Sequence, residues 1–528
     1  MSKSQNKIFK SVAVVTIFAV MTRVISFLFK IYLSRAYGAE TVGLYQICLS
    51  VLLLLLSISV GGMPTVLSRK IAEAETFKNF KRQNALTFAS ILIGLLTSGI
   101  IIAICFLMRS HLNLIFSDAR AGDLFLIMLP ALITSTIYCS IRAFLMGKKK
   151  FFAFSVTELL EEILKIIFTV LFATCAVSWI SGATAIAVAF LIADCVCALV
   201  LVIVFFASGG RIAKPQGFLE LTKSSLPLTT LRISTGLVAS LTAIVVPLML
   251  TKNGLSSNEA TALYGEVSGM ALPLITAPTT IIGSLAIVLL PDMAKANVLC
   301  DNKDIENKLG YSLIFCTYVC SAAFIAFTSL GMEIGELFFG NKEAGRFVSI
   351  CASLMFFIGA NQTTTPVLNS LGLENKTLRN YIIGLALFIP LILILPKFVG
   401  VYSIAIANGA MLLVSCLLNF LTLKRREIKL NYKLRNLFMA ALTAPCILLS
   451  NFLRGILPIS SSFCFARLSQ SACTRLSSQC LRLCRLTFRS KSDARTKKRN
   501  PPKERHESKR LQFDAHEVFS LMICNVNR

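Results

Sequence analysis

The side chains best suited to chemistry are four charged residues inside long apolar stretches: Arg23, Asp194, Arg232 and Glu266. A charge in a membrane span is costly unless it is paired or hydrated, so each is a candidate functional residue. Arginine stays charged and binds phosphate through paired hydrogen bonds. Because Arg23 and Arg232 hold comparable places in two similar parts of the chain, we predict that both meet a pyrophosphate or another anionic headgroup in one cleft. The alternative for both is a side chain that reaches out to the membrane surface.

The two acidic residues support different interpretations. Glu266 follows Tyr264 early in an apolar stretch. There it either binds a cation, balances the charge of Arg232, or lies at the membrane surface. Asp194 lies deep in its stretch, and either lines the same cleft or pairs with a lysine or arginine inside the protein.

A further group of charges, at 158–165, has helical spacing. Glu158 and Glu162 are four residues apart, as are Glu161 and Lys165, so each pair shares a helix face. Acidic residues are favoured near the N-terminus of a helix. The group is therefore either an interfacial cap or a polar path into the protein.

Several kinds of chemistry are not indicated by the sequence. Of its 3 histidines, His506 and His516 lie in the C-terminal tail. No cysteine and histidine cluster with metal-ligand spacing is present, and no Gly-Lys-Ser/Thr phosphate loop follows Gly61-Gly62. We therefore expect no metal, no cofactor, no ATP hydrolysis and no enzymatic activity.

Membrane-spanning helices must position these residues. The 528 residues are 55% hydrophobic and only 15% charged, whereas a soluble domain carries about 25% charged residues. About thirteen apolar stretches approach the ~20 residues that a crossing helix needs. They lie near 11–33, 43–66, 84–108, 121–145, 154–177, 183–206, 225–250, 264–290, 309–332, 344–369, 379–396, 400–423 and 435–454. The predicted fold class is an all-α integral membrane protein.

Lysine and arginine are concentrated in every second loop, and this distribution predicts the orientation. Lys148-Lys149-Lys150 and the segment 211–223 are examples, whereas the intervening loops carry few. Cytoplasmic loops hold the excess of Lys and Arg in membrane proteins. We therefore expect a multi-pass protein of the cell membrane with a cytoplasmic N-terminus. The formal charge of +27 then reflects topology, and no nucleic-acid partner is expected.

Two parts of the chain resemble each other. The stretch 44–74 begins at Leu-Tyr, passes through a proline and ends in a short charged, alanine-rich segment, and 263–296 does the same. A membrane protein built twice from one pattern usually moves a solute between its halves, and an even number of spans per half predicts a parallel repeat. The predicted parts are a six-helix lobe at 1–206, a cytoplasmic linker at 207–224, a second six-helix lobe at 225–423 and an additional span at 424–458.

Glycine and proline interrupt the helices where a cavity is expected. Gly61, Gly62 and Pro64 break the second span, and Pro273 and Pro278 bend the eighth. Such breaks are tolerated where helices border a cavity or flex.

The tail at 459–528 differs from the rest in composition. It is basic, contains cysteines and has no clear helical face. A thirteenth span would place it outside the cell, whereas a basic tail is expected inside. It is therefore either a disordered segment that returns to the cytoplasm or non-native sequence in place of a fourteenth span.

Several short stretches carry a family resemblance. They include Thr22-Arg23-Val24-Ile25-Ser26, Tyr37-Gly38-Ala39-Glu40, Gly61-Gly62-Met63-Pro64-Thr65, Gly269-Met270-Ala271-Leu272-Pro273 and Leu290-Pro291-Asp292. Together they resemble the polysaccharide-transporter branch of the multidrug/oligosaccharidyl-lipid/polysaccharide exporter superfamily, in particular its stage V sporulation protein B family of lipid-linked oligosaccharide flippases.

This resemblance implies a V-shaped bundle of two helical lobes related by a pseudo-twofold axis. It also implies flipping of an isoprenoid-pyrophosphate-linked sugar precursor for peptidoglycan, spore-cortex or polysaccharide assembly. Membrane lipids and cell-wall synthesis proteins are the implied partners. The cleft arginines of the family correspond to Arg23 and Arg232.

Two other functions remain open. A cation-coupled multidrug antiporter of the same superfamily would require an acidic cavity in the first lobe, whereas arginine is prominent here. A membrane-embedded glycan polymerase would require a large outer loop with catalytic acids or histidine. The predicted outer loops are short, and only 333–346 is acidic.

Overall fold

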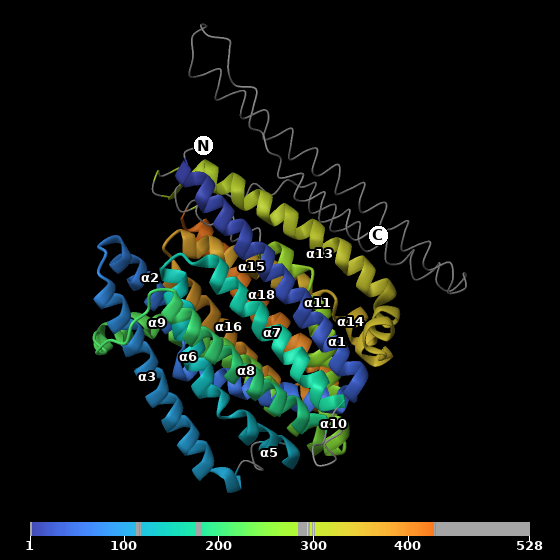
Figure 1. The fold of residues 1–528 in the computed structure, drawn as a ribbon. Coiled ribbons are helices and arrows are strands. Elements are labelled where there is room, and N and C mark those ends of the chain that lie inside the picture. The colour runs from blue at the N-terminus through green and yellow to red at the C-terminus, as the bar shows by residue number, and fades with distance from the viewer. Residues whose placement is uncertain are drawn as a thin grey trace, which may run out of the picture. The chain divides into compact units, whose positions relative to one another are not determined.

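The computed structural model describes residues 3–111, 118–174, 182–283 and 301–426, together with the positions 116, 293, 296, 297, 299 and 428. These residues belong to one compact unit, Met1–Ile456, and all their regular secondary structure is helical (Figure 1). Seven of the described helices are long and apolar enough to cross a membrane, or up to nine with two bent pairs. The predicted all-α membrane fold is confirmed, whereas the predicted span at 435–454 and the tail at 459–528 lie outside the described residues.

The helices of the first half run back and forth along the bundle. They are α1 (Lys3–Ser59), α2 (Met63–Thr76), α3 (Phe80–Leu107), η1 (Arg109–His111), α5 (Ala119–Met128), α6 (Ala131–Gly147), α7 (Phe151–Thr174) and α8 (Gly182–Ala207). The sequence predicted a polar loop between spans at 11–33 and 43–66. The two spans are the two parts of α1, which are separated at Gly38, where a φ of 77° that glycine adopts without steric penalty interrupts the helix.

The helices of the second half follow a linker at 208–217. They are α9 (Phe218–Lys252), α10 (Ser257–Tyr264), η2 (Gly265–Ala271), α11 (Leu272–Thr276), α13 (Asn302–Phe339), α14 (Lys342–Cys351), α15 (Leu354–Ser370), α16 (Glu374–Ile394), α17 (Pro396–Val399), η3 (Gly400–Tyr402) and α18 (Ser403–Lys424). The segment η2 is a π-helix, a local widening that occurs frequently at functional sites.

Two of the predicted spans are bent. The span predicted at 121–145 consists of α5 and α6, which meet at 41°, and that at 344–369 consists of α14 and α15, which meet at 62°. Pro130 is the N-cap of α6. Because proline has no backbone N–H, it interrupts the helical hydrogen bonds between α5 and α6.

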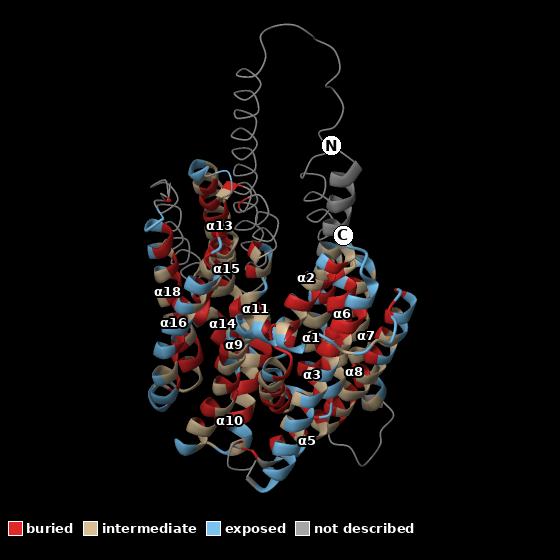
Figure 2. Cartoon of the chain, turned by 90° about the vertical axis from the view of Figure 1, so that its left-hand side faces the viewer, coloured by how far each residue is buried: buried red, intermediate tan, exposed pale blue. Residues whose placement is uncertain are grey.

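The two ends of the bundle differ in how the lobes meet. We call the end with Lys148-Lys149-Lys150 and the linker the basic end, and the end with the N-termini of α5 and α10 the Arg120 end. Towards the Arg120 end, one apolar core includes both lobes, for example Leu33 and Leu124 with Tyr264. At the basic end, one core surrounds α2 and α6 and includes Leu221 from the start of α9, and another surrounds α13 and α15. Figure 2 shows these as separate groups of buried residues.

The long helix α9 is attached to both lobes. Near its start, Glu220 contacts Lys70 of α2 and lies 3.2 Å from Arg82 of α3. Just after its end, the Asn253 amide donates to the Pro396 carbonyl of α17 at 3.2 Å. The helix also contains Pro227 and Pro247.

Candidate functional site

Arg23 and Arg232 lie on the first long helix of each lobe, α1 and α9. Both side chains are exposed. Neither forms an ion pair or hydrogen bond with any residue whose side chain the structure describes. The exposed surface of α1 around Arg23 is apolar, with Met21 and Val24 46% and 53% exposed. A charged group in such surroundings is available to an external anion.

The second lobe contacts α1 one turn beyond Arg23, towards the Arg120 end. The ring of Phe27 packs edge-on against Phe338 and Phe339 of α13 at 5.8 and 6.2 Å. Arg35 Nε donates to the Phe338 carbonyl at 2.9 Å. Arg23 therefore lies on the basic-end side of the place where α1 and α13 meet.

Arg232 lies on a stretch of α9 that packs closely on the first lobe. The Gly62 N–H donates to Thr229 Oγ1 at 2.9 Å, and Ser240 Oγ donates to the Ser50 carbonyl at 2.9 Å. Arg232 lies between these contacts along α9, so its backbone is fixed while its side chain is exposed.

Glu266 is half-buried in the π-helix η2. Its carboxylate accepts a hydrogen bond from Asn341 Nδ2 at 2.8 Å. Asn341 also caps α14 by accepting from the Ala344 N–H at 2.9 Å. The structure therefore joins Glu266 to an amide of its own lobe, and gives it no contact with Arg232.

Asp194 is buried in α8, 2% exposed. Its carboxylate accepts hydrogen bonds from the Thr134 hydroxyl and, at 3.0 Å, from Ser135 Oγ of α6. The observed partners are hydroxyl groups, whereas the sequence suggested a lysine or arginine. Asp194 faces the interior of the first lobe, so the structure does not bring it to Arg23.

The charges of segment 158–165 lie well inside α7, which begins at Phe151. Lys165 Nζ lies 2.7 Å from Glu161, and the two side chains are only 13% and 18% exposed. Arg142 of α6 lies 2.7 Å from Glu158. The interior of the first lobe thus contains a paired charge network beside Asp194, which has hydroxyl partners alone.

The predicted helix breaks occur in several settings. Gly61 and Gly62 form the turn between α1 and α2, and Pro64 lies in the first turn of α2, where its missing N–H is tolerated. Pro273 lies in the first turn of α11, and Pro278 lies in the turn that follows. A Cβ on Gly62 would lie 2.8 Å from backbone atoms of α9, so this break is also a close contact between helices.

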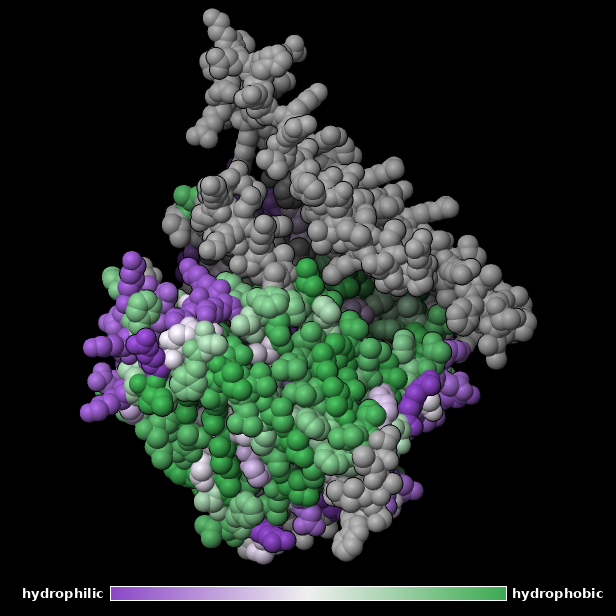
Figure 3. Space-filling model, in the orientation of Figure 1, coloured by the Kyte–Doolittle hydropathy of each residue, from purple (hydrophilic) through white to green (hydrophobic). Residues whose placement is uncertain are grey.

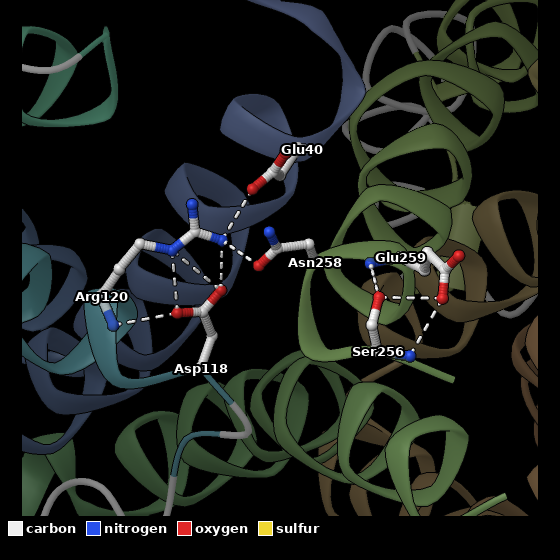
Figure 4. Close-up of polar contacts among 6 residues, drawn as sticks. All are labelled: Glu40, Asp118, Arg120, Ser256, Asn258 and Glu259. Carbon is white, nitrogen blue, oxygen red and sulfur yellow. Dashed lines mark hydrogen bonds and ion pairs between the residues drawn. The ribbon is translucent and has the colours of Figure 1, made fainter. Parts of the chain in front are cut away.

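A polar cluster at the Arg120 end connects the lobes, and the sequence analysis missed it. Arg120, at the start of α5, lies 2.7 Å from Asp118 and 2.7 Å from Glu40 of α1. Its Nη2 also donates to Asn258 Oδ1 of α10 in the second lobe at 2.7 Å (Figure 4). The available signal was the Asp-x-Arg spacing before a helix, because Asp118 caps α5 by accepting from the Arg120 N–H.

A capping box fixes the helix that carries Asn258. Ser256 Oγ accepts from the Glu259 N–H at 3.3 Å, and the Glu259 carboxylate accepts from the Ser256 N–H at 3.0 Å (Figure 4). The backbone hydrogen bond from Ser256 lowers the pKa of Glu259 below its ordinary value. Both interactions satisfy N–H groups that a helix start leaves unpaired.

Backbones of the two lobes touch beside this cluster. A Cβ on Gly43 of α1 would clash with the Thr261 carbonyl of α10, and a Cβ on Gly265 would lie 2.7 Å from the Gly43 nitrogen. Glycine at both positions permits this approach. The repeated stretches that begin near Tyr45 and Tyr264 therefore contact each other at their starts. Much of the second stretch, 284–292, lies outside the described residues.

Two helical lobes contact each other at the Arg120 end, have separate cores at the basic end, and carry exposed arginines on their first helices. The chain belongs to the polysaccharide biosynthesis protein family, whose model matches residues 8–297.

Two curated relatives come from Bacillus subtilis strain 168. Stage V sporulation protein B is 23% identical over 377 residues, which cover 69% of this chain and 73% of that protein. Sporulation protein YkvU is 24% identical over 358 residues, which cover 65% and 78%. Both relatives match over most of their own length.

Solved structures share the fold. Lipid II flippase MurJ in an inward closed conformation aligns with a TM-score of 0.70 and 15% identity, covering 88% of this chain and 98% of that one. An inward-facing multidrug resistance MATE transporter of the MOP superfamily aligns with a TM-score of 0.65 and 14% identity, covering 79% and 98%. Both likenesses show that the chain shares the fold of these two proteins.

Proposed function

We propose that the protein flips a lipid-linked sugar precursor, with an isoprenoid pyrophosphate as the anchor, across the cell membrane. The observation that carries the proposal is an exposed arginine on the first long helix of each lobe, Arg23 and Arg232. Neither has an ion-pair partner among the side chains that the structure describes. An arginine kept in an apolar helix without a protein partner suits a negatively charged ligand.

Pyrophosphate fits this pair of residues for chemical reasons. It carries negatively charged oxygens on two phosphorus atoms, and each can accept paired hydrogen bonds from a guanidinium group. Two arginines from opposite lobes can therefore hold one headgroup. Glu266 and Asp194, which the sequence also suggested for this site, have other partners, Asn341 and the hydroxyl groups of α6 respectively.

The relatives support the class of cargo. A lipid II flippase shares the fold, and the relative named stage V sporulation protein B matches over 69% of this chain. We infer that the precursor serves peptidoglycan, spore-cortex or polysaccharide assembly. Cell-wall synthesis proteins are the expected partners.

We infer that the basic end faces the cytoplasm. Lys148-Lys149-Lys150, Arg211 and Lys214 gather there, and cytoplasmic loops of membrane proteins are enriched in lysine and arginine. With this orientation the N-terminus is cytoplasmic, and a cargo on the cytoplasmic leaflet meets the end at which the lobes have separate cores.

A cation-coupled multidrug antiporter is the second candidate, and a specific observation favours it. Asp194 is buried with hydroxyl partners, beside the Lys165–Glu161 pair in the first lobe. A buried carboxylate without a basic partner is suited to binding a proton or a monovalent cation. The fold shared with multidrug transporters agrees with this alternative as well.

Translocation in vesicles tests the proposal. Purified full-length protein is reconstituted, and flipping of a fluorescent isoprenyl-pyrophosphate sugar is followed by quenching from outside. We expect flipping by the parent protein and a loss of roughly tenfold or more in Arg23→Ala and Arg232→Ala, because hydrogen bonds to charged groups contribute about 1.5–3 kcal/mol. Arg379→Ala, which removes an exposed arginine of α16, is the control and should retain the parental rate.

Two results would contradict the proposal. One is parental flipping by Arg23→Ala, which would make Arg23 a membrane-surface residue. The other is transport of a cationic dye driven by a proton or sodium gradient, with no flipping of the pyrophosphate lipid, which would support the antiporter.

A further inference from the structure

A cavity at the basic end is lined by neither Arg23 nor Arg232. Its volume is about 400 Å³, and it lies between α2, the end of α6, the start of α7 and α9. Ligand pockets in proteins measure roughly 300–1,000 Å³, so this cavity has room for a headgroup and the first carbons of a chain.

The lining combines an apolar floor with two cations. Val66, Met146 and Leu228 contribute apolar surface, and Arg69 and Lys149 contribute charge. Met146 is 47% exposed, so the apolar part of the cavity opens onto the surface of the protein. Figure 3 shows hydrophilic residues gathered at the end that carries α2, next to a broad hydrophobic surface.

These two cations differ from their sequence neighbours. Lys70 is 12% exposed and contacts Glu220, and Lys148 Nζ donates to the Ser208 carbonyl at 3.2 Å. By contrast, the Arg69 side chain is 67% exposed with Glu73 only at 3.9 Å. Lys149 is exposed and has no ionic partner among the described residues. In each adjacent pair, one cation thus binds a group of the protein, and the other is exposed at the surface.

The backbone places Lys149 in an unusual conformation. It follows the C-terminus of α6 with a φ of +57°, a region in which glycine is the ordinary residue. A lysine there is disfavoured by steric contact of its Cβ. Lys78 has the same conformation outside the cavity, so the position of Lys149 in the lining, and not its backbone, supports a role in binding.

We propose that this cavity binds an anionic glycerophospholipid of the surrounding leaflet, with its phosphate between Arg69 and Lys149 and its acyl chain along Met146 and Leu228. Arginine and lysine both bind lipid phosphate, and each basic residue near an anionic membrane contributes about 1 kcal/mol. The open, apolar side of the cavity suits a lipid that arrives from the membrane. Because neither Arg23 nor Arg232 lines the cavity, this inference does not depend on the transported cargo.

Lipid binding to the purified full-length protein tests this inference. Delipidated protein in detergent is titrated with phosphatidylglycerol, phosphatidylcholine or an isoprenyl diphosphate, and bound lipids are counted by native mass spectrometry. We expect phosphatidylglycerol to bind at least tenfold more tightly than phosphatidylcholine. Arg69→Gln/Lys149→Gln should reduce the phosphatidylglycerol affinity by roughly tenfold or more, as the loss of two such contacts predicts.

Two further variants make the test specific. Lys78→Gln/Lys81→Gln removes the same charge at the same end, and Lys78 also has a positive φ of 53°, but neither residue lines the cavity. This control should bind phosphatidylglycerol like the parent. Met146→Trp fills the apolar side with both cations retained, and should reduce the affinity.

Three results would overturn the inference. The first is equal binding of phosphatidylglycerol and phosphatidylcholine. The second is an equal loss in the control and in Arg69→Gln/Lys149→Gln, which would indicate attraction by the whole basic end. The third is preferential binding of the isoprenyl diphosphate that Arg69→Gln/Lys149→Gln abolishes, which would assign the cavity to the cargo.

Discussion

The Arg120 end and the basic end use arginine in opposite ways. At the Arg120 end, Arg120 contacts three oxygen-bearing side chains, one of them in the other lobe, and the backbones at Gly43 and Gly265 touch. Towards the basic end, Arg23 and Arg232 are exposed, and each lobe has a separate core. An arginine that is hydrogen-bonded inside the protein therefore joins the lobes, whereas an arginine without a protein partner is available to a ligand.

The contact between Gly43 and Gly265 should produce the largest effect when it is changed. Gly43→Leu places a side chain against the Thr261 carbonyl. We expect it to destabilise the protein by about 3 kcal/mol or more, because overpacked contacts between backbones relax poorly. Thermal unfolding in detergent, followed by size-exclusion chromatography, measures the change.

A matched glycine serves as the control for that change. A Cβ on Gly99 of α3 would have no heavy atom within 4 Å, so Gly99→Leu should unfold at the parental temperature. If Gly43→Leu were as stable as Gly99→Leu, the lobes would not meet there in the functional protein.

Lysine substitutions should produce the next largest effect. Arg23→Lys and Arg232→Lys keep the charge but lose the paired hydrogen-bond geometry. We expect flipping of the pyrophosphate lipid below the parental rate and above that of the alanine variants, because lysine keeps the charge and loses only the paired geometry. Initial rates in vesicles provide the measurement. Full activity in both lysine variants would show that charge alone is required.

The bridge between Arg120 and Asn258 should contribute less. The Arg120 side chain is 50% exposed, and exposed charged contacts contribute about 0.2–1 kcal/mol. In a double-mutant cycle of Arg120→Ala and Asn258→Ala, unfolding free energies should show a coupling of that size. Arg379→Ala paired with Arg120→Ala should be additive, because Arg379 of α16 has no contact with this cluster. Additivity in the Asn258 cycle would show that Arg120 only organises its own lobe.

Deletion of residues 459–528 should have the smallest effect. The tail is basic and its composition conflicts with the side of the membrane expected after a thirteenth span. We expect parental flipping and a parental unfolding temperature for the truncated protein. A truncated protein that inserts normally but no longer flips lipid would show that the tail is required.

The sequence predicted where most helices lie, but it did not predict which residues of different helices contact each other. Apolar runs of membrane length predicted the all-α fold because their hydrophobicity is a local property. One interruption lies where the sequence predicted it and one was not predicted: Gly38 is non-helical between the spans predicted at 11–33 and 43–66, whereas Pro130 divides the span predicted at 121–145 into α5 and α6.

Contacts between distant residues could not be derived from one sequence. Asp194 accepts from Ser135, 59 residues away, and Asn341 donates to Glu266 across 75 residues. Which helix faces pack together depends on the side chains of both, and a single sequence does not contain that pairing. The same limit explains why the contacts of Arg120 were missed, because its place in the first turn of a helix does not indicate a partner in the other lobe.

The attachment of α9 to both lobes has a mechanical consequence. Glu220 ties its first turn to α2 and α3, and Asn253 ties the residue after it to α17. A helix that is fixed at its two ends to different lobes must bend if those lobes rotate against each other. The bending will concentrate at Pro227 and Pro247, where the helix lacks a backbone hydrogen bond. The elastic energy of this one helix therefore adds to the barrier between conformations, whichever cargo is bound.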